Sequence, residues 1–284
     1  MMNILITNDD GYRAKGLLTL VKIMRPYGRI TVIAPKYPQS GMSMAVSMGF
    51  RQIAAKRLPD QDGVRWYYLD ATPASCVKFG IDNVFADEGL RPDIVVSGIN
   101  HGSNAATAAN YSGTLGAAEE AAINGIPAIG VSIATMSPNA DFSCVGRFFP
   151  DIFDGLTSSP AVSSGIYYNV NFPNLPISRI KGVRVAHQGS GHWEREFIAY
   201  DPTLLERNGI DPDMFGPRYA PAREEGEELY MMGGEFKDDS GDDALADHHV
   251  MTEGYVAICA HNVLNSDVRE INRLRSLGMD RDFI

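Results

Sequence analysis

Short apolar runs separated by helix-like segments dominate the first two thirds of the chain. Residues 4–6 are typical of a strand buried on both faces, residues 14–24 place apolar side chains at helical spacing, and residues 30–34 are typical of a second buried strand. A strand, a helix and a strand within about thirty residues have the size of a right-handed parallel crossover. The pattern therefore predicts a parallel sheet whose strands are joined by helices.

The same alternation continues to residue 172 and predicts a doubly wound α/β layer. Residues 44–50 and 63–69 interrupt it with alternating apolar and polar positions, which predict an antiparallel excursion with a turn at 59–63. The remaining elements predicted in this part are helices at 73–85, 115–124 and 142–156 and strands at 94–96, 128–132 and 167–172.

The pattern changes beyond residue 179, where predicted strands follow one another without helices between them. Strands are predicted at 183–186, 197–200 and 255–259. Near the end of the chain, apolar residues from Leu264 to Leu277 form a helical stripe, which we interpret as a surface for packing in the core or between subunits.

Composition adds that the chain can bury a sizeable core, since it has 284 residues of which 44% are hydrophobic. No apolar run is long enough to cross a membrane and no secretory signal pattern precedes the first strand, so we expect a cytoplasmic protein. The three cysteines are far apart and form no C-x-x-C, which disfavours a disulfide framework or a cysteine-bound zinc. A formal net charge of -10 disfavours duplex nucleic acid or an anionic membrane as the main partner.

Most of the negative charge lies late in the chain. Between Arg223 and Asp247 there are ten acidic residues against two basic ones. Such a run is more typical of a solvated, mobile stretch than of a second metal site. His248 and His249 follow it directly, but the sequence alone does not make this pair a metal site.

Candidate chemistry begins where the first predicted strand ends, at Asp9, Asp10 and Gly11. In open α/β sheets, ligands sit outside the carboxyl ends of the strands. Two neighbouring carboxylates repel each other, and a hard divalent cation such as Mg²⁺ or Mn²⁺ relieves the repulsion. The alternative is a turn that caps the next helix, and these three residues alone do not separate the two interpretations.

Other polar residues follow the later strands, at what should be the same edge of the sheet. Ser40 lies in the loop after the second strand, and Asn100 follows the third. The run Ser112-Gly113-Thr114 precedes a helix and could offer hydroxyls and free amides to an anion, although an ordinary helix cap would use the same residues. His101, next to Asn100, could meet a phosphate or a leaving oxygen, but the favoured interpretation is a loop histidine with a local hydrogen bond.

These residues belong to motifs that occur in the order N-D-D-G, Q-S-G, S-G-I-N-x-G-x-N, Y-S-G-T-L-G-A-A and N-V-N-F-P. In this order they closely resemble the stationary-phase survival protein SurE, a family of metal-dependent 5'/3'-nucleotidases. The matches span most of residues 2–260. The resemblance implies an α/β fold with a Rossmann-like, three-layer core of parallel strands. We expect one domain over 1–284, with the core at 1–175 and a β-rich extension and oligomerisation segment at 176–284.

The resemblance also implies a site. One divalent ion per subunit, Mg²⁺ or Mn²⁺, would be held by the positions that match here as Asp9, Asp10, Ser40 and Asn100, and the two aspartates would be catalytic. The substrate phosphate would meet Asn100 and the turn Ser112-Gly113-Thr114. The substrates would be nucleoside 5'- and 3'-monophosphates. Family members tend to form homodimers or homotetramers, for which the carboxyl-terminal stripe is available.

Two other functions share parts of this pattern. A signalling receiver domain also places paired acids after its first strand, but it needs a phosphoacceptor aspartate and a lysine at later strand ends, and the residues after 96 and 131 supply neither. A nucleotide- or polyphosphate-binding protein without catalysis would keep the same ligands, so the sequence leaves that alternative open.

Overall fold

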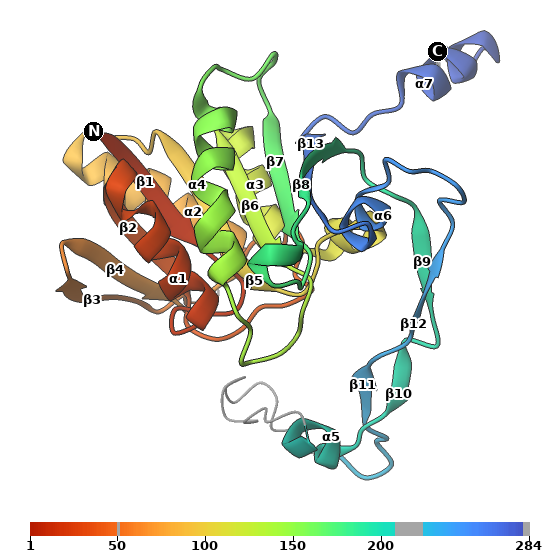
Figure 1. Ribbon diagram of the computed structural model, residues 1–284, viewed down its shortest axis with the longest axis horizontal. Helices are drawn as coiled ribbons and strands as arrows, with labels where there is room; N and C mark the ends of the chain where they lie inside the picture. Colours follow the sequence, from red (N-terminus) through yellow and green to blue (C-terminus); the bar gives the residue numbers. More distant parts are fainter. Residues whose placement is uncertain (50–51, 208–223, 281–284) are drawn as a thin grey trace, which may run out of the picture.

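A nine-stranded sheet forms the centre of the protein, seen here in a computed structural model that describes residues 1–49, 52–207 and 224–280 (Figure 1). Its strands are β1 (Met2–Thr7), β2 (Gly28–Pro35), β3 (Ala55–Gln61), β4 (Val64–Leu69), β5 (Ile94–His101), β6 (Ala128–Ile133), β7 (Ile166–Phe172), β8 (Gly182–Ala186) and β13 (Tyr255–Asn262).

The spatial order of these strands is β3-β4-β2-β1-β5-β6-β7-β13-β8. The neighbours from β4 to β7 all run parallel, so their carboxyl ends share one edge. In contrast, β3 and β13 run antiparallel to β4 and β7. The predicted, mostly parallel α/β sheet is therefore confirmed.

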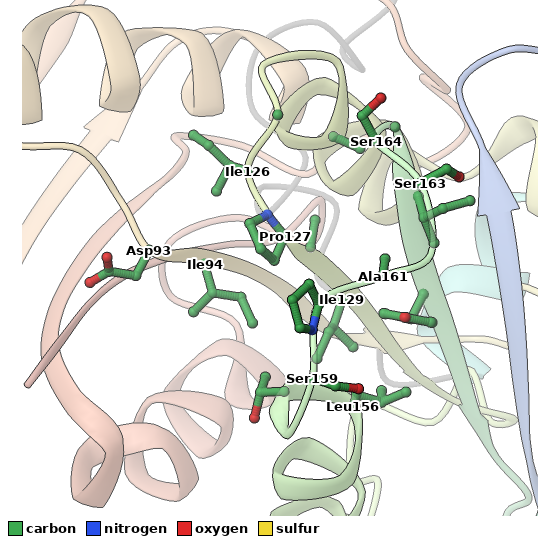
Figure 2. Close-up of a pocket in the computed structure, with 18 of the residues that line it drawn as sticks. Asp93, Ile94, Ile126, Pro127, Ile129, Leu156, Ser159, Ala161, Ser163 and Ser164 are labelled. Carbon is green, nitrogen blue, oxygen red and sulfur yellow. The ribbon is translucent and has the colours of Figure 1, made fainter.

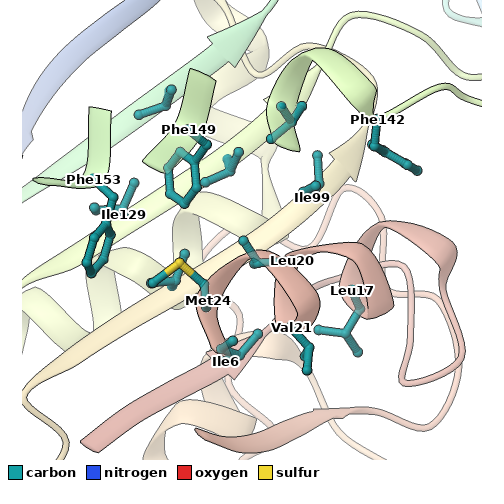
Figure 3. Packing of buried hydrophobic residues seen from close by; sticks show 14 of the residues in the cluster. Ile6, Leu17, Leu20, Val21, Met24, Ile99, Ile129, Phe142, Phe149 and Phe153 are labelled. Atoms are coloured by element: carbon teal, nitrogen blue, oxygen red, sulfur yellow. The ribbon is translucent and has the colours of Figure 1, made fainter. Parts of the chain in front are cut away.

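Helices cover both faces of the sheet. One face carries α1 (Lys15–Met24) and α4 (Ser143–Thr157), and the other carries α2 (Pro73–Phe79), its continuation η2 (Gly80–Phe85) and α3 (Gly113–Ile123). On the first face, apolar side chains of both helices meet the sheet in one cluster (Figure 3) that includes Ile6, Leu17, Leu20, Val21, Met24, Ile99, Ile129, Phe142, Phe149 and Phe153. Burial on both faces explains why the central strands are apolar runs rather than alternating ones.

The strand predicted over 44–50 is wrong. Residues 44–49 form no strand, and residue 50 lies outside the described residues. The backbone here bonds to segments at the starts of two helices instead. Ser43, just before the stretch, donates its amide to the carbonyl of Tyr111, two residues before α3, at 3.0 Å, and Ser47 donates its amide to the hydroxyl of Ser75 in α2 at 2.8 Å. The antiparallel partner of β4 is therefore β3, which begins only at Ala55.

The third strand is longer than predicted, because β5 continues past residue 96 to His101. A register shift between Gly98 and Asn100 places one extra residue, Ile99, opposite β6. A bulge of this kind bends a strand and re-aims its side chains. Gly98 permits it, since a Cβ there would overlap the carbonyl of Val131, and its φ is +139°. Asn100 therefore sits inside a bent strand end rather than in a loop.

The chain beyond residue 176 divides between the sheet and an arm. Strands β8 and β13 belong to the nine-stranded sheet, so the sheet includes residues from both sides of position 175, where the predicted core ends. Two short ribbons extend away from the three-layer body (Figure 1), and they pair β9 (Gly191–Glu194) with β12 (Glu235–Asp238) and β10 (Phe197–Ala199) with β11 (Tyr230–Met232).

The described part of the acidic segment, 224–247, is mostly exposed to solvent, as its charge predicts, but it also contains regular structure. It supplies β11 and β12, and it ends at α6 (Asp247–Thr252), which packs on β13. The last helix, α7 (Val268–Ser276), projects from the body and buries none of its side chains (Figure 1). Among the described residues, no helix has both the length and the hydrophobicity to cross a membrane.

Candidate functional site

The two aspartates Asp9 and Asp10 follow β1 directly, at the carboxyl edge of the sheet. Asp9 is almost fully buried, with 3% of its surface exposed, whereas the side chain of Asp10 is 18% exposed. The preceding Asn8 is also buried. Its side-chain nitrogen donates to the carbonyl of Gly11 at 3.0 Å, and no described residue hydrogen-bonds to its side-chain oxygen. The turn therefore holds oxygen atoms at the centre of the edge.

The carboxylate of Asp9 is held in an unfavourable electrostatic environment. Burial and the neighbouring charge of Asp10 raise its pKa from 3.8 to about 7. The hydroxyl of Thr114, which is fully buried, donates to Asp9 Oδ1 at 2.6 Å and opposes part of this shift. A positive partner would stabilise this buried anion further, but no described lysine, arginine or histidine pairs with Asp9.

Asp10 is fixed by a residue far away in the sequence. Its Oδ2 lies 3.2 Å from the backbone nitrogen of His101 and 3.0 Å from His101 Nδ1. The imidazole packs edge-on against Phe142, with ring centroids 5.3 Å apart. The interpretation of His101 as a histidine with a purely local hydrogen bond is therefore wrong, because the end of β5 bends towards β1.

A buried amide network holds the end of β5. Asn100 donates its side-chain nitrogen to the carbonyl of Gly102 at 2.9 Å and lies 3.4 Å from Asn104 Oδ1. Asn104 in turn donates to the hydroxyl of Ser132 and receives bonds from the asparagines of the N-V-N-F-P motif. Both contacts of Asn100 use the nitrogen of its side-chain amide, and no described residue hydrogen-bonds to the amide oxygen. The roles of Asn104, Asn169 and Asn171 were not predicted from the sequence, although all three lie in the quoted motifs.

The loop that carries Ser40 lies beside Asp9. The backbone nitrogen of Gln39 donates to the carbonyl of Asp9 at 2.7 Å, and the exposed Ser40 follows directly. Gln39 itself is buried, and its side-chain oxygen has no hydrogen-bond partner among the described residues. Gly113 closes the contact, since a Cβ there would lie 3.0 Å from Asp9 Cβ and 3.1 Å from both Asp9 Oδ2 and the Gln39 carbonyl.

Helix α3 begins at the same place. The hydroxyl of Ser112 caps it by accepting the amide of Leu115 at 3.1 Å. The first amides of a helix have no acceptor within the helix, so this terminus favours an anion. Thr114 lies here too, but its hydroxyl is committed to Asp9. The structure therefore brings the predicted residues together: Asp9 contacts both the Ser40 loop and α3, and Asp10 contacts β5 next to Asn100.

The oxygen atoms of this edge suit a hard divalent cation. The predicted ligands Asp9, Asp10, Ser40 and Asn100 offer carboxylate, hydroxyl and amide oxygens, which Mg²⁺ and Mn²⁺ prefer. The raised pKa of Asp9 fits such an ion, as do the buried oxygens of Asn8 and Gln39, which have no hydrogen-bond partner among the described residues.

A large cavity lies elsewhere. It has a volume of about 570 Å³ and is lined by residues at the amino ends of β5 and β6 and by the loop after α4, among them Asp93, Ile94, Pro127 and Ser159 (Figure 2). This is the opposite edge of the parallel sheet. None of the predicted site residues lines it, so the paired carboxylates and not the cavity mark the candidate site.

Replacing Asp9 with Asn removes a buried charge and keeps an oxygen for the Thr114 hydroxyl. In metal-free protein near pH 8 we expect this variant to have a higher free energy of unfolding than the parent chain, by up to about 4 kcal/mol. The reason is that the carboxylate of Asp9 is ionised at a pH above its pKa of about 7, and its buried charge destabilises the fold. The gain should shrink to less than about 1 kcal/mol as the pH falls to about 4, where the folded chain holds the proton and the unfolded chain holds it for part of the time. Urea unfolding in EDTA at both pH values measures it, and an equal difference at the two would contradict the burial argument.

Replacing Gly113 with Ala puts a Cβ between Asp9 and Gln39. We expect a loss of about 1–3 kcal/mol in the free energy of unfolding, because the side chain of Asp9 and the backbone carbonyl of Gln39 would both have to move. The matched control is Gly146→Ala in α4, where a Cβ meets nothing within 4 Å, so this change should be neutral or stabilise by about 1 kcal/mol. Comparable losses in the two variants, measured by thermal unfolding, would show that the contact at Gly113 is unimportant.

Comparison with known proteins agrees with this geometry. The model of the family described as survival protein SurE matches residues 4–195. A protein of Cytophaga hutchinsonii named 5'-nucleotidase SurE is 37% identical over 265 residues, which are 92% of this chain and 91% of that protein. A protein of the same name from Bacteroides fragilis is 36% identical over 255 residues, 90% of this chain and 89% of that one.

The fold agrees as well. The crystal structure of the SurE protein from Aquifex aeolicus superimposes with a TM-score of 0.74 at 26% identity, and the match covers 97% of this chain and 99% of that one. SurE proteins are generally metal-dependent, which agrees with the oxygen donors gathered at this edge. The family match and the identity over nine tenths of the chain lead to one conclusion: this chain belongs to the SurE family.

Proposed function

We propose that this protein is a divalent-metal-dependent phosphomonoesterase that hydrolyses nucleoside 5'-monophosphates, and also 3'-monophosphates, to nucleoside and phosphate. The observation that supports this most is the buried Asp9 beside Asp10, with the amino end of α3 in contact with it. An oxygen-lined cation site next to a helix terminus that favours anions is the pairing that phosphoryl transfer requires. The relatives that carry the name 5'-nucleotidase SurE support the choice of substrate.

The residues that would hold the ion are Asp9, Asp10, Ser40 and Asn100, one ion per subunit. When bound, Mg²⁺ or Mn²⁺ supplies a Lewis acid that polarises a phosphoryl oxygen and lowers the pKa of a water molecule. Asp9 is suited to direct ligation, since its burial excludes water and Thr114 fixes its orientation. Asn100 is suited to present its oxygen, because its nitrogen is bonded to Gly102.

Asp10 is the group we assign to orient or deprotonate the attacking water. It is more exposed than Asp9. Its Oδ2 contacts the backbone nitrogen and the ring of His101, and this contact fixes the orientation of the carboxylate and so of Oδ1. Ser112 and the first amides of α3 would bind the phosphate and stabilise the charge on the phosphoryl group. Thr114 is a positioning residue, since its hydroxyl proton is given to Asp9.

Phosphate release from AMP, GMP and 3'-AMP, with and without Mn²⁺, tests the proposal. We expect turnover that EDTA abolishes, and a loss of at least about 100-fold in kcat for Asp9→Asn and Asp10→Asn, because both the ion and the oriented water depend on them. The control is Asp151→Asn on the surface of α4, where the side chain is 79% exposed and activity should be unchanged.

Full activity in EDTA or in Asp9→Asn would exclude the metal mechanism. Nucleotide binding without any turnover would instead favour the alternative function, a non-catalytic nucleotide- or polyphosphate-binding protein.

We also infer that the chain forms a homodimer or homotetramer. The apolar residues Leu264, Val268, Leu274 and Leu277 on and beside α7 are 80%, 64%, 39% and 61% exposed, which is costly for a helix that buries no side chain against the described part of the chain. Light scattering after size exclusion should give two or four chains per particle. Replacing Leu274 and Leu277 together with Ser should shift the particle to a smaller mass, whereas a monomeric parent chain would contradict the inference.

A further inference from the structure

A cluster of two histidines and one aspartate lies at the base of the arm, away from the paired carboxylates of β1. Asp238 ends β12, and His248 and His249 lie in the first turn of α6. Asp238 Oδ1 is 3.0 Å from His248 Nε2, and Asp238 Oδ2 is 2.6 Å from His249 Nε2. One ligand atom from each residue falls within 4.8 Å of the other two. The three side chains thus converge on one point.

The contacts of His249 orient its ring so that Nε2 faces Asp238. His249 Nδ1 lies 2.7 Å from the carbonyl of Asp243, which can only accept, so Nδ1 carries the proton. In a neutral ring, Nε2 would then direct its lone pair at a carboxylate oxygen 2.6 Å away. A metal ion bound by this lone pair and by the Asp238 oxygen would replace the proton that otherwise joins the two atoms, once they move apart to the spacing of two ligands on one ion.

His248 has the arrangement of a metal-binding histidine with a carboxylate behind it. Its Nδ1 is buried, makes no hydrogen bond within the described residues and faces Asp247 Oδ1 at 3.5 Å. Asp247 is fully buried and is itself fixed by the amides of Ala106 and Gly189. A Cβ at Gly189 would overlap the ring of His248, so glycine keeps the space for it. Carboxylates or carbonyls behind both rings are the usual outer shell of a histidine metal site.

From this geometry we propose that Asp238, His248 and His249 form a second metal site, suited to Zn²⁺ or a similar transition metal and distinct from the oxygen-lined site of Asp9 and Asp10. Two imidazole nitrogens and one carboxylate oxygen are ligands of Zn²⁺, with water in the fourth position. The side chains are 38%, 18% and 25% exposed, so an ion can enter from solvent.

An ion at this site would connect the arm to the body. Asp238 belongs to the ribbon of the arm, whereas α6 packs on β13 of the main sheet. Through Asp247, α6 is bonded to Ala106, the first residue of the short helix η4 (Ala106–Tyr111) that leads into Ser112. Metal binding would therefore stabilise the base of the arm against the segment that carries the phosphate-binding turn.

The test is Zn²⁺ binding by calorimetry in an Asp9→Asn background, which weakens the oxygen-lined site. We expect one Zn²⁺ per chain, a rise in melting temperature on binding, and visible ligand-field bands of four-coordinate geometry when Co²⁺ replaces Zn²⁺. Asp238→Asn and His249→Gln, each in the same background, should weaken binding by more than the roughly 10- to 100-fold that loss of an outer-shell partner costs. The matched control is His192→Asn, which removes a histidine paired with the neighbouring Asp239 at 2.7 Å and should leave binding unchanged.

Each triad variant is also made in the chain that keeps Asp9, where Mn²⁺-dependent phosphate release shows whether it folds. The proposal is overturned if the Asp9→Asn chain binds no Zn²⁺, or if both triad variants bind it as tightly as the control. Because the readout is Zn²⁺ binding, failure of this proposal does not affect the proposed nucleotidase function, which rests on the Mn²⁺ assays.

Discussion

The buried charge of Asp9 is the constraint on which the carboxyl edge of the sheet depends. Folding takes this carboxylate out of water and leaves it beside a second one, and a single hydroxyl from Thr114 compensates only in part. The surrounding chain is arranged to permit this. Gly113 leaves room for the carboxylate, and the Gln39 amide fixes the backbone of Asp9. The unfavourable electrostatics are thus a local cost that the proposed cation would offset.

The rest of the site is held by polar groups that satisfy one another. The bend at Gly98 turns the end of β5 towards β1, so that His101 reaches Asp10 and Asn100 meets the asparagines of β7 through Asn104. Buried amides without partners are costly, so a network of this kind favours a single arrangement. The rigidity of the site therefore comes from three strands that are distant in sequence.

The candidate ligand atoms at the base of the arm differ in type from those at the carboxyl edge of the sheet. Asp9, Asp10, Ser40 and Asn100 offer only oxygen, whereas two imidazoles converge on Asp238. Hard cations and transition metals distinguish such sets by ligand type. The two proposed sites therefore differ in the class of metal ion that their ligands prefer.

The sequence by itself determined the α/β class, most helix and strand positions and the residues of the candidate edge, because periodicity and motif order are local properties. Tertiary structure decided the rest. Residues 44–49 form no strand, because the backbone here bonds to helices instead. Strand β5 extends through a bulge, and β13, which is distant in the sequence, pairs with β7 in the main sheet. The contacts of Asp10 with His101 and of Asp238 with His248 and His249 join segments whose proximity no local pattern encodes, since it depends on how strands and helices pack.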